Sequence, residues 1–249
     1  AFLRTNGYDD IYAQENYPRK EVVNSFGVPD HFLYRYALQK LQQQKQPFMA
    51  TLLSISNHPP YVIPEWFHAN SEEEELQIVE YADDALRIFF KQAAEQPWYG
   101  NSVFVLLGDH GKLTGSPECE MPQCLNHIPL IIHAPGLAPE EIDSWCMQMD
   151  VQPTLLSLLG IRAEQEHFGQ NILQKPRSMA LYTADNMIGA RSDGHLYIYE
   201  PGTGTEWFYK SAADNKVVYC EEPDSTLLHM KRTLFSTLQT AQEEIKKHE

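Results

Sequence analysis

The chain contains three largely apolar runs, over residues 48–55, 103–107 and 128–132. The run at residues 103–107 is rich in β-branched and aromatic residues and lacks polar alternation, which is typical of a strand that is buried on both faces. Polar or turn-forming residues bound the runs, so none is long enough for a core helix. We therefore expect an α/β fold with a mostly parallel central sheet flanked by helices.

Apolar residues at helical spacing predict four helices, over residues 31–44, 71–94, 150–160 and 225–247. A polar residue at each start is expected to serve as the cap: Asp30, Ser71, Asp150 and Ser225. Residues 72–75 are four glutamates, which the helix dipole favours in a first turn. A calcium site at these glutamates stays open as an alternative.

Short β-like runs follow at residues 179–183, 196–199, 207–209 and 216–219, separated by Gly, Pro, Asp and Asn. They predict a small antiparallel sheet, which the last helix would accompany. We place the domain boundary between residues 175 and 176, with the C-terminal β/α subdomain after it.

Composition narrows the classes of partner. The 249 residues carry a net charge of −15, and nucleic acid is therefore excluded as a partner because its phosphates require clustered Lys and Arg. An anionic substrate would have to be held by a metal ion rather than by the overall field.

The sequence Gly108-Asp-His-Gly111 stands directly after the apolar run at residues 103–107. Ligands in open α/β sheets bind at the carboxyl ends of strands. A carboxylate and an imidazole suit a divalent ion such as Zn²⁺ or Mn²⁺, so Asp109 and His110 are candidate metal ligands. The alternative is that Asp109 caps the next segment and His110 is a surface residue.

Four motifs in a fixed order, over residues 48–61, 108–111, 126–136 and 149–160, resemble the alkaline-phosphatase/sulfatase superfamily. They are most similar to the branch that contains lipoteichoic acid synthase and the phosphoglycerol transferases. The likeness extends from about residue 1 to about residue 175, and implies that this part is the C-terminal portion of a sulfatase-like catalytic domain. It also implies one divalent metal ion, Mn or Zn, with Mg or Ca as further options.

The same resemblance assigns roles to two more histidines. It implies that His58 and His127 contact the substrate anion. The residues alone favour a hydrogen-bonded turn histidine at position 58 and equally allow a histidine packed at a strand start at position 127. The loop at residues 26–30 resembles one that the family places beside its active site, often with Trp at position 26. A polar loop precedes His127 and is expected to form a lid or wall on the substrate side.

In the resembled enzymes a metal-bound threonine alkoxide attacks a phosphodiester, and a glutamate completes the metal site. Neither motif is found here, since the only threonines before His58 are Thr5 and Thr51, outside any strand-to-helix elbow. We therefore expect no catalytic nucleophile in this chain, weak metal binding and no turnover by the chain alone. The full-length protein would be a metal-dependent transferase or hydrolase; a sulfatase and a catalytically incomplete binding domain are the alternatives.

The expected substrate is a phospholipid or glycolipid headgroup. No apolar run reaches 18 residues and the first residues lack the features of a signal peptide, so any membrane association would come from segments before residue 1. The resemblance implies a catalytic domain outside the cytoplasm, at the cell membrane. Cys119 and Cys124 bracket a short loop, and whether they form a disulfide with each other is left open. Cys146 and Cys220 are interpreted as free thiols.

Overall fold

The fold is described from a computed structural model that covers residues 2–164, 167–211 and 216–247. The contacts divide the chain into two compact units. The first contains the described residues up to Phe104 together with His133–Leu137, and the second contains Val105–Ile132 and the described residues from Ala138 onward. The boundary expected after residue 175 stays a prediction.

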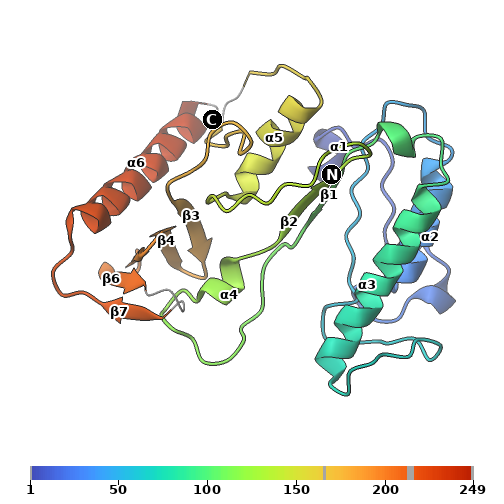
Figure 1. Ribbon diagram of the computed structural model, residues 1–249, viewed down its shortest axis with the longest axis horizontal. Coiled ribbons are helices and arrows are strands. Elements are labelled where there is room, and N and C mark those ends of the chain that lie inside the picture. The colour runs from blue at the N-terminus through green and yellow to red at the C-terminus, as the bar shows by residue number, and fades with distance from the viewer. Residues whose placement is uncertain (1, 165–166, 212–215, 248–249) are drawn as a thin grey trace. The chain divides into compact units, whose positions relative to one another are not determined.

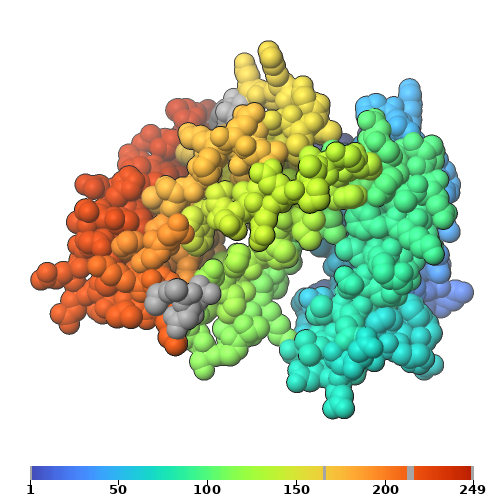
Figure 2. Space-filling model, in the orientation of Figure 1, coloured from blue at the N-terminus to red at the C-terminus, as the bar shows by residue number. Residues whose placement is uncertain are grey.

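The first unit is built around two helices, α2 (Asp30–Leu41) and α3 (Glu74–Ala93), which lie side by side (Figure 1). Leu38 of α2 packs with Phe89 and Ala93 of α3, and Trp98 closes this core. The short helices of the unit are α1 (Phe2–Thr5), η1 (Gln14–Asn16), η2 (Arg19–Glu21) and η3 (Tyr99–Asn101). The part of this unit that faces the viewer in the space-filling view is coloured blue to green (Figure 2). Both long helices confirm the prediction that was made from the spacing of apolar residues.

The predicted caps of these two helices are wrong. Asp30 is the first helical residue of α2 and makes no capping bond, because its side chain turns to another segment. Ser71 lies before α3 and instead donates its backbone N–H to Glu80 at 3.0 Å. The hydrogen bond from the Ser71 hydroxyl is the main cause that lowers the pKa of Glu80. Both polar residues thus form hydrogen bonds with residues later in the sequence, Ser56 and Glu80, instead of capping the helix that follows them.

Residues 48–55 do not form the predicted strand. Within the described residues no other strand pairs with this segment, and a continuous apolar run becomes a strand only where a neighbour completes its hydrogen bonds. Phe48 reaches the core of the first unit, but Met49 and Leu53 are each 75% exposed. The backbone N–H of Ile55 donates to Asp30 rather than to a strand.

The strands β1 (Phe104–Leu107) and β2 (Leu130–His133), most of whose residues belong to the second unit, form a two-stranded sheet. Both strands were predicted from their apolar runs. The expected burial of both faces is not found at the end of β1, where Leu107 is 45% exposed. The α/β class is confirmed, whereas the mostly parallel central sheet stays a prediction, since the described residues hold two strands in this region.

The C-terminal part of the second unit is a five-stranded antiparallel meander, in the order β3-β4-β5-β6-β7. Its strands are β3 (Ala180–Ala184), β4 (Met187–Ser192), β5 (His195–Glu200), β6 (Thr205–Ser211) and β7 (Val217–Tyr219). The helix α6 (Ser225–Lys247) follows. The predicted antiparallel sheet and the helix after it are confirmed, but β4 was missed because its sequence, MIGARS, is small and polar in its second half.

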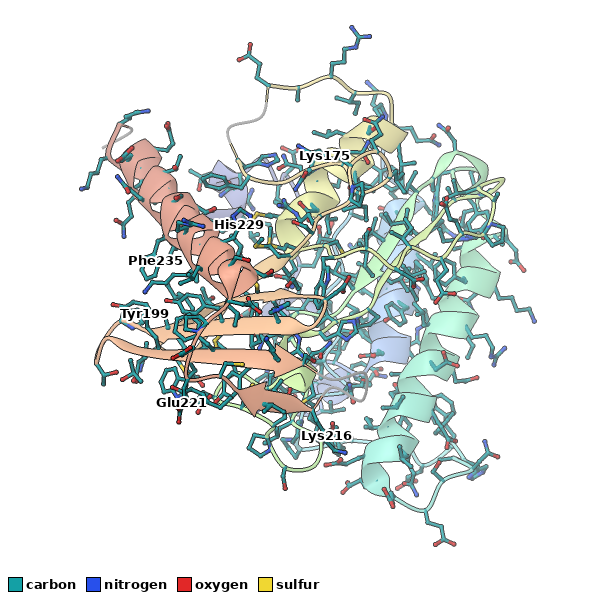
Figure 3. All side chains as sticks on the ribbon, turned by 60° about the vertical axis from the view of Figure 1, so that its left-hand side comes forward. Lys175, Tyr199, Lys216, Glu221, His229 and Phe235 are labelled. Carbon is teal, nitrogen blue, oxygen red and sulfur yellow. The ribbon has the colours of Figure 1, made fainter. Side chains whose placement is uncertain are left out.

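Alternation along β5 buries both faces of this sheet. Tyr197 faces α6 and packs with Leu227 and Met230, and the ring of Tyr199 meets that of Phe235 at 5.0 Å between centroids (Figure 3). Leu196 and Ile198 belong to a separate core with Met121, which comes from the long loop before β2. The sheet therefore anchors a helix through one core and a loop through the other.

No helix in the described part of the chain combines the length and the apolar composition that a bilayer crossing requires. All four cysteines are free thiols in the structure, Cys119 and Cys124 included.

Candidate functional site

Asp109 and His110 stand in the turn that follows β1, with side chains 77% and 72% exposed. One carboxylate oxygen of Asp109, Oδ1, accepts the backbone N–H of His110 at 2.9 Å. The other, Oδ2, lies 3.7 Å from His110 Nε2. His110 Nδ1 lies 2.7 Å from the carbonyl oxygen of Gly111, so a proton on Nδ1 leaves the Nε2 lone pair on the side of the carboxylate.

This arrangement fits two ligands of one divalent ion. Two donors that each lie ~2.0 Å from a tetrahedral ion are separated by roughly 3.3 Å, close to the observed spacing of Oδ2 and Nε2. Metal-binding histidines commonly direct the other ring nitrogen to a carbonyl oxygen, as His110 does here. In the part of the chain that the structure describes, no group of three His, Cys, Asp or Glu side chains is placed to hold an ion.

Gly111 is required by the close approach of a short helix, α4 (Gln123–Asn126). Its N–H donates to the carbonyl of Leu125 at 2.9 Å, and a Cβ at position 111 would lie 1.9 Å from the carbonyl oxygen of Cys124. Only glycine fits there without a backbone shift. The turn that carries the candidate ligands is therefore fixed against α4.

Gln148 fixes the other side of the same turn. Its amide Nε2 donates to the carbonyl oxygens of Gly108, at 3.3 Å, and Asp109, at 3.1 Å. Gln148 begins η4 (Gln148–Asp150), which continues into α5 (Val151–Leu158), and Gly160 ends that region at φ +67°. Sequence reasoning missed Gln148, although it directly precedes a motif that the resemblance had singled out.

Asp150 is fully buried and holds η4 in place. It occupies the N-cap position of α5 as predicted, but its carboxylate makes no capping bond to that helix. Instead it accepts the backbone N–H groups of Met147 and Gln170, both at 2.8 Å, and two bonds from Arg177. Burial raises the pKa of Asp150, but these hydrogen bonds outweigh it and leave the pKa below its usual value.

The loop between Gly111 and α4 is anchored on the C-terminal sheet. Met121 is fully buried, and the Tyr209 hydroxyl donates to Glu120 at 2.7 Å. The buried guanidinium of Arg191 lies 4.0 Å from Glu118, which also accepts the backbone N–H of Gln123 at 2.7 Å. The C-terminal sheet thus supports the loop that was expected to line the substrate side.

His127 directly follows α4 and is exposed. Its backbone N–H donates to the backbone carbonyl of Gln123 at 2.8 Å, and its Nδ1 lies 3.5 Å from Nε2 of the Gln123 side chain. The exposure speaks against a histidine packed into a core. A substrate contact at His127 stays a prediction.

His58 lies in the first unit, at the end of residues 48–55. Its backbone N–H closes a turn onto Ile55 at 3.0 Å, and its Nδ1 lies 2.6 Å from the carbonyl of Pro59. Its ring meets that of Phe26 with centroids 4.0 Å apart. The two loops singled out by the sequence therefore do meet. A substrate contact at His58 stays a prediction.

An open cavity of about 970 Å³ lies beside α5, and its lining includes Arg162 and Lys175. None of the four predicted site residues lines it. We therefore place the candidate chemistry at the turn after β1 and not in this cavity.

Comparison with known proteins decides the family. The family model described as Sulfatase matches residues 1–161. The chain belongs to the sulfatase family. A solved protein of the alkaline phosphatase superfamily from Vibrio parahaemolyticus superposes on this sulfatase-family chain with a TM-score of 0.80 and 26% identity, covering 96% of the chain and 60% of that protein.

Curated relatives of this sulfatase-family chain are lipoteichoic acid synthases. Lipoteichoic acid synthase 1 of Bacillus subtilis (strain 168) is 28% identical over 222 residues, which cover 80% of this chain and 35% of the relative. Lipoteichoic acid synthase of Staphylococcus aureus (strain USA300) is 26% identical over 193 residues, 68% of this chain and 30% of the relative. The expected superfamily and branch are confirmed, and the chain spans about a third of the length of these relatives.

Proposed function

We propose that the chain is part of a metal-dependent transferase or hydrolase that acts on the phosphodiester headgroup of a phospholipid or glycolipid. The observation that carries the proposal is the pairing of Asp109 Oδ2 with His110 Nε2 at 3.7 Å, in a turn that Gly111 and Gln148 hold from two sides. The support from relatives is the similarity to lipoteichoic acid synthases.

In this proposal Asp109 and His110 hold one divalent ion, Mn²⁺ or Zn²⁺ by their chemistry, with Mg²⁺ or Ca²⁺ as further options. The ion would lower the pKa of a hydroxyl nucleophile and offset the charge that gathers on the phosphoryl oxygens. Neither residue is a nucleophile. The threonine and the glutamate that complete such a site in the resembled enzymes would come from parts of the protein outside these 249 residues.

The chain's own residues would bind and orient the substrate. His58 and His127 each present an exposed imidazole that, when both ring nitrogens are protonated, can donate a hydrogen bond to a non-bridging phosphate oxygen. Phe26, which is 48% exposed, offers an apolar surface next to His58. We propose that the catalytic domain works outside the cytoplasm, at the membrane that supplies the lipid.

The test assays the whole protein with a phospholipid that carries a glycerol phosphate headgroup, with and without Mn²⁺. Release or transfer of glycerol phosphate should require the metal and should be lost in Asp109→Ala. The matched control is Asp143→Ala, which removes an exposed carboxylate from a loop of the same unit. Metal-dependent cleavage of a sulfate ester in place of the phosphodiester would make the protein a sulfatase, and unimpaired turnover by Asp109→Ala would remove the metal assignment.

A further inference from the structure

Asp30 is a buried carboxylate that no part of the proposed chemistry uses. It is 2% exposed, and its Oδ1 accepts three hydrogen bonds from one loop. These come from the backbone N–H groups of Ile55, at 3.2 Å, and Ser56, at 3.1 Å, and from the Ser56 hydroxyl, at 2.7 Å. The Ser56 hydroxyl oxygen in turn accepts the backbone N–H of Asp30 at 3.0 Å.

Each partner adjoins a ring that is exposed: Asp30 begins α2 directly after the loop that carries Phe26, and Ser56 lies in the loop that carries His58. Ser56 lies two residues before His58, and the turn between them is closed by the bond from the His58 N–H to Ile55. Asp30 ends a loop in which Gly27 has φ +140° and Val28 is buried. The pair of Asp30 and Ser56 therefore ties together the two segments that bear Phe26 and His58.

The outer ends of the two segments meet as well. Phe26 lies with its ring centroid 4.0 Å from that of His58, at an interplanar angle of 40°. Asn24 Oδ1 accepts the backbone N–H of Phe26 at 2.9 Å and so fixes the near side of this contact. Among the described residues, the hydrogen bonds of His58 go to its own turn, to Ile55 and Pro59, and none goes to a helix or strand.

Helix α3 contacts the start of α2 through the side chain of Tyr81. The Tyr81 hydroxyl lies 2.6 Å from His31 Nδ1 and 3.3 Å from the His31 backbone nitrogen, and Tyr81 is fully buried. Asp30 is thus presented by a helix terminus that cannot easily move, whereas residues 48–55 have no strand partner in the described chain.

We propose that Asp30 is a positioning residue: through Ser56 it fixes the loop of residues 55–58 so that the imidazole of His58 faces the ring of Phe26 and is ready to contact the substrate phosphate. The substrate part of this proposal depends on the function proposed above. The positioning part does not. Because all three bonds go to Oδ1, the acceptor atom matters and the negative charge does not, so asparagine can replace Asp30 and alanine cannot.

The structural test is NMR of the 249-residue chain with labelled histidine. The ring of Phe26 shifts the resonances of the His58 imidazole protons, and Phe26→Ala defines complete loss of that shift. Asp30→Ala should lose most of it, Ser56→Ala should lose part, and Asp30→Asn should retain it. Asp83→Ala, an exposed carboxylate on α3, is the matched control and should change nothing. Native His58 shifts in Asp30→Ala or in Ser56→Ala, or equal loss in Asp30→Asn and Asp30→Ala, would overturn the proposal.

The functional test measures kcat/KM of the whole protein. His58→Ala and Asp30→Ala should each lower it about 10–100-fold, and the double variant should be no worse than His58→Ala, because a misplaced group and a missing group lose the same contact. Multiplying effects would show that Asp30 acts elsewhere. Unchanged turnover in His58→Ala would remove His58 from the proposed function, while the NMR result would still decide the positioning role.

Discussion

Arg177 donates two hydrogen bonds to the fully buried carboxylate of Asp150, from Nε to Oδ2 at 2.7 Å and from Nη2 to Oδ1 at 2.5 Å. This pair joins η4 to the segment that leads into β3, and η4 carries Gln148 to the turn of Asp109. The ion pair therefore supports the candidate metal site indirectly, through η4 and Gln148.

Removing Arg177 leaves a buried carboxylate without its counter-charge. Arg177→Ala should lower the free energy of unfolding by about 3 kcal/mol, measured from urea denaturation. The control is Arg87→Ala on α3, where an exposed arginine pairs with Asp84 three residues away and about 0.5 kcal/mol or less is expected. An equal decrease in the free energy of unfolding in both variants would show that the buried ion pair contributes no more to stability than the exposed one.

Asp224 caps α6, whereas the sequence pointed to Ser225. Its Oδ1 accepts the backbone N–H groups of Thr226 and Leu227, both at 3.1 Å, and its Oδ2 lies 3.2 Å from both Lys210 Nζ and His195 Nε2. The bond from Leu227 is the main cause that lowers the pKa of Asp224 from 3.8 to about 2, and Lys210 and His195 add to it.

Because the folded pKa lies below the unfolded one, Asp224 stabilises the fold above about pH 4, and this stabilisation is lost as the pH falls toward about 2. Asp224→Ala should lower the Tm at pH 7 by a few degrees, as loss of a helix cap does, and the difference from the native chain should shrink below pH 4. Ser225→Ala should leave the Tm nearly unchanged. A Tm difference for Asp224→Ala that is constant from pH 7 to pH 2 would contradict the capping role of the carboxylate.

Gly111→Ala places a methyl group 1.9 Å from the Cys124 carbonyl oxygen and must displace the turn of Asp109 and His110. We expect the affinity of the whole protein for Mn²⁺ to fall about 10-fold or more, as when outer-shell support of a ligand is lost. Isothermal titration calorimetry measures it. Gly100→Ala, where a Cβ meets nothing within 4 Å, is the control and should bind as the native protein does. An unchanged affinity for Mn²⁺ in Gly111→Ala would show that this turn does not bind the metal.

The four thiols should differ in reactivity. Burial raises the pKa of Cys119 to about 11, and it also raises the pKa of Cys146, but Cys146 is the more exposed of the two. Iodoacetamide at pH 8 should therefore label Cys146 well before Cys119, because the thiolate is the reacting form. Peptide mass spectrometry over time measures the order. Protection of Cys119 and Cys124 together, removed by a reductant, would instead reveal a disulfide between them.

The sequence predicted the elements whose signals are local. The spacing of Ile78, Tyr81, Ala85 and Phe89 is enough to define α3, and α6 begins and ends where it was expected. Strand β4 has no such signal because its neighbours, not its own composition, bury it. Residues 48–55 show the opposite case, an apolar run that forms no strand because no partner lies beside it in the described chain.

Asp109 and His110 could be proposed as candidate ligands from the sequence because a carboxylate and an imidazole follow a strand directly, and their role as ligands stays a prediction. Their supports were not. Gln148 reaches the turn from 39 residues away, and Arg177 meets Asp150 across 27 residues, so no spacing rule connects them. Asp30 was assigned to the helix that it begins, while its hydrogen bonds go to a loop 25 residues later.

Pulsed electron paramagnetic resonance of Mn²⁺ bound to the whole protein tests the central claim most directly, because it detects nitrogen coordinated to the ion. We predict a ¹⁴N coupling from one imidazole that disappears in His110→Ala and persists in His127→Ala, together with loss of stoichiometric Mn²⁺ in Asp109→Ala. An unchanged ¹⁴N coupling in His110→Ala would contradict the assignment of this turn as the metal site.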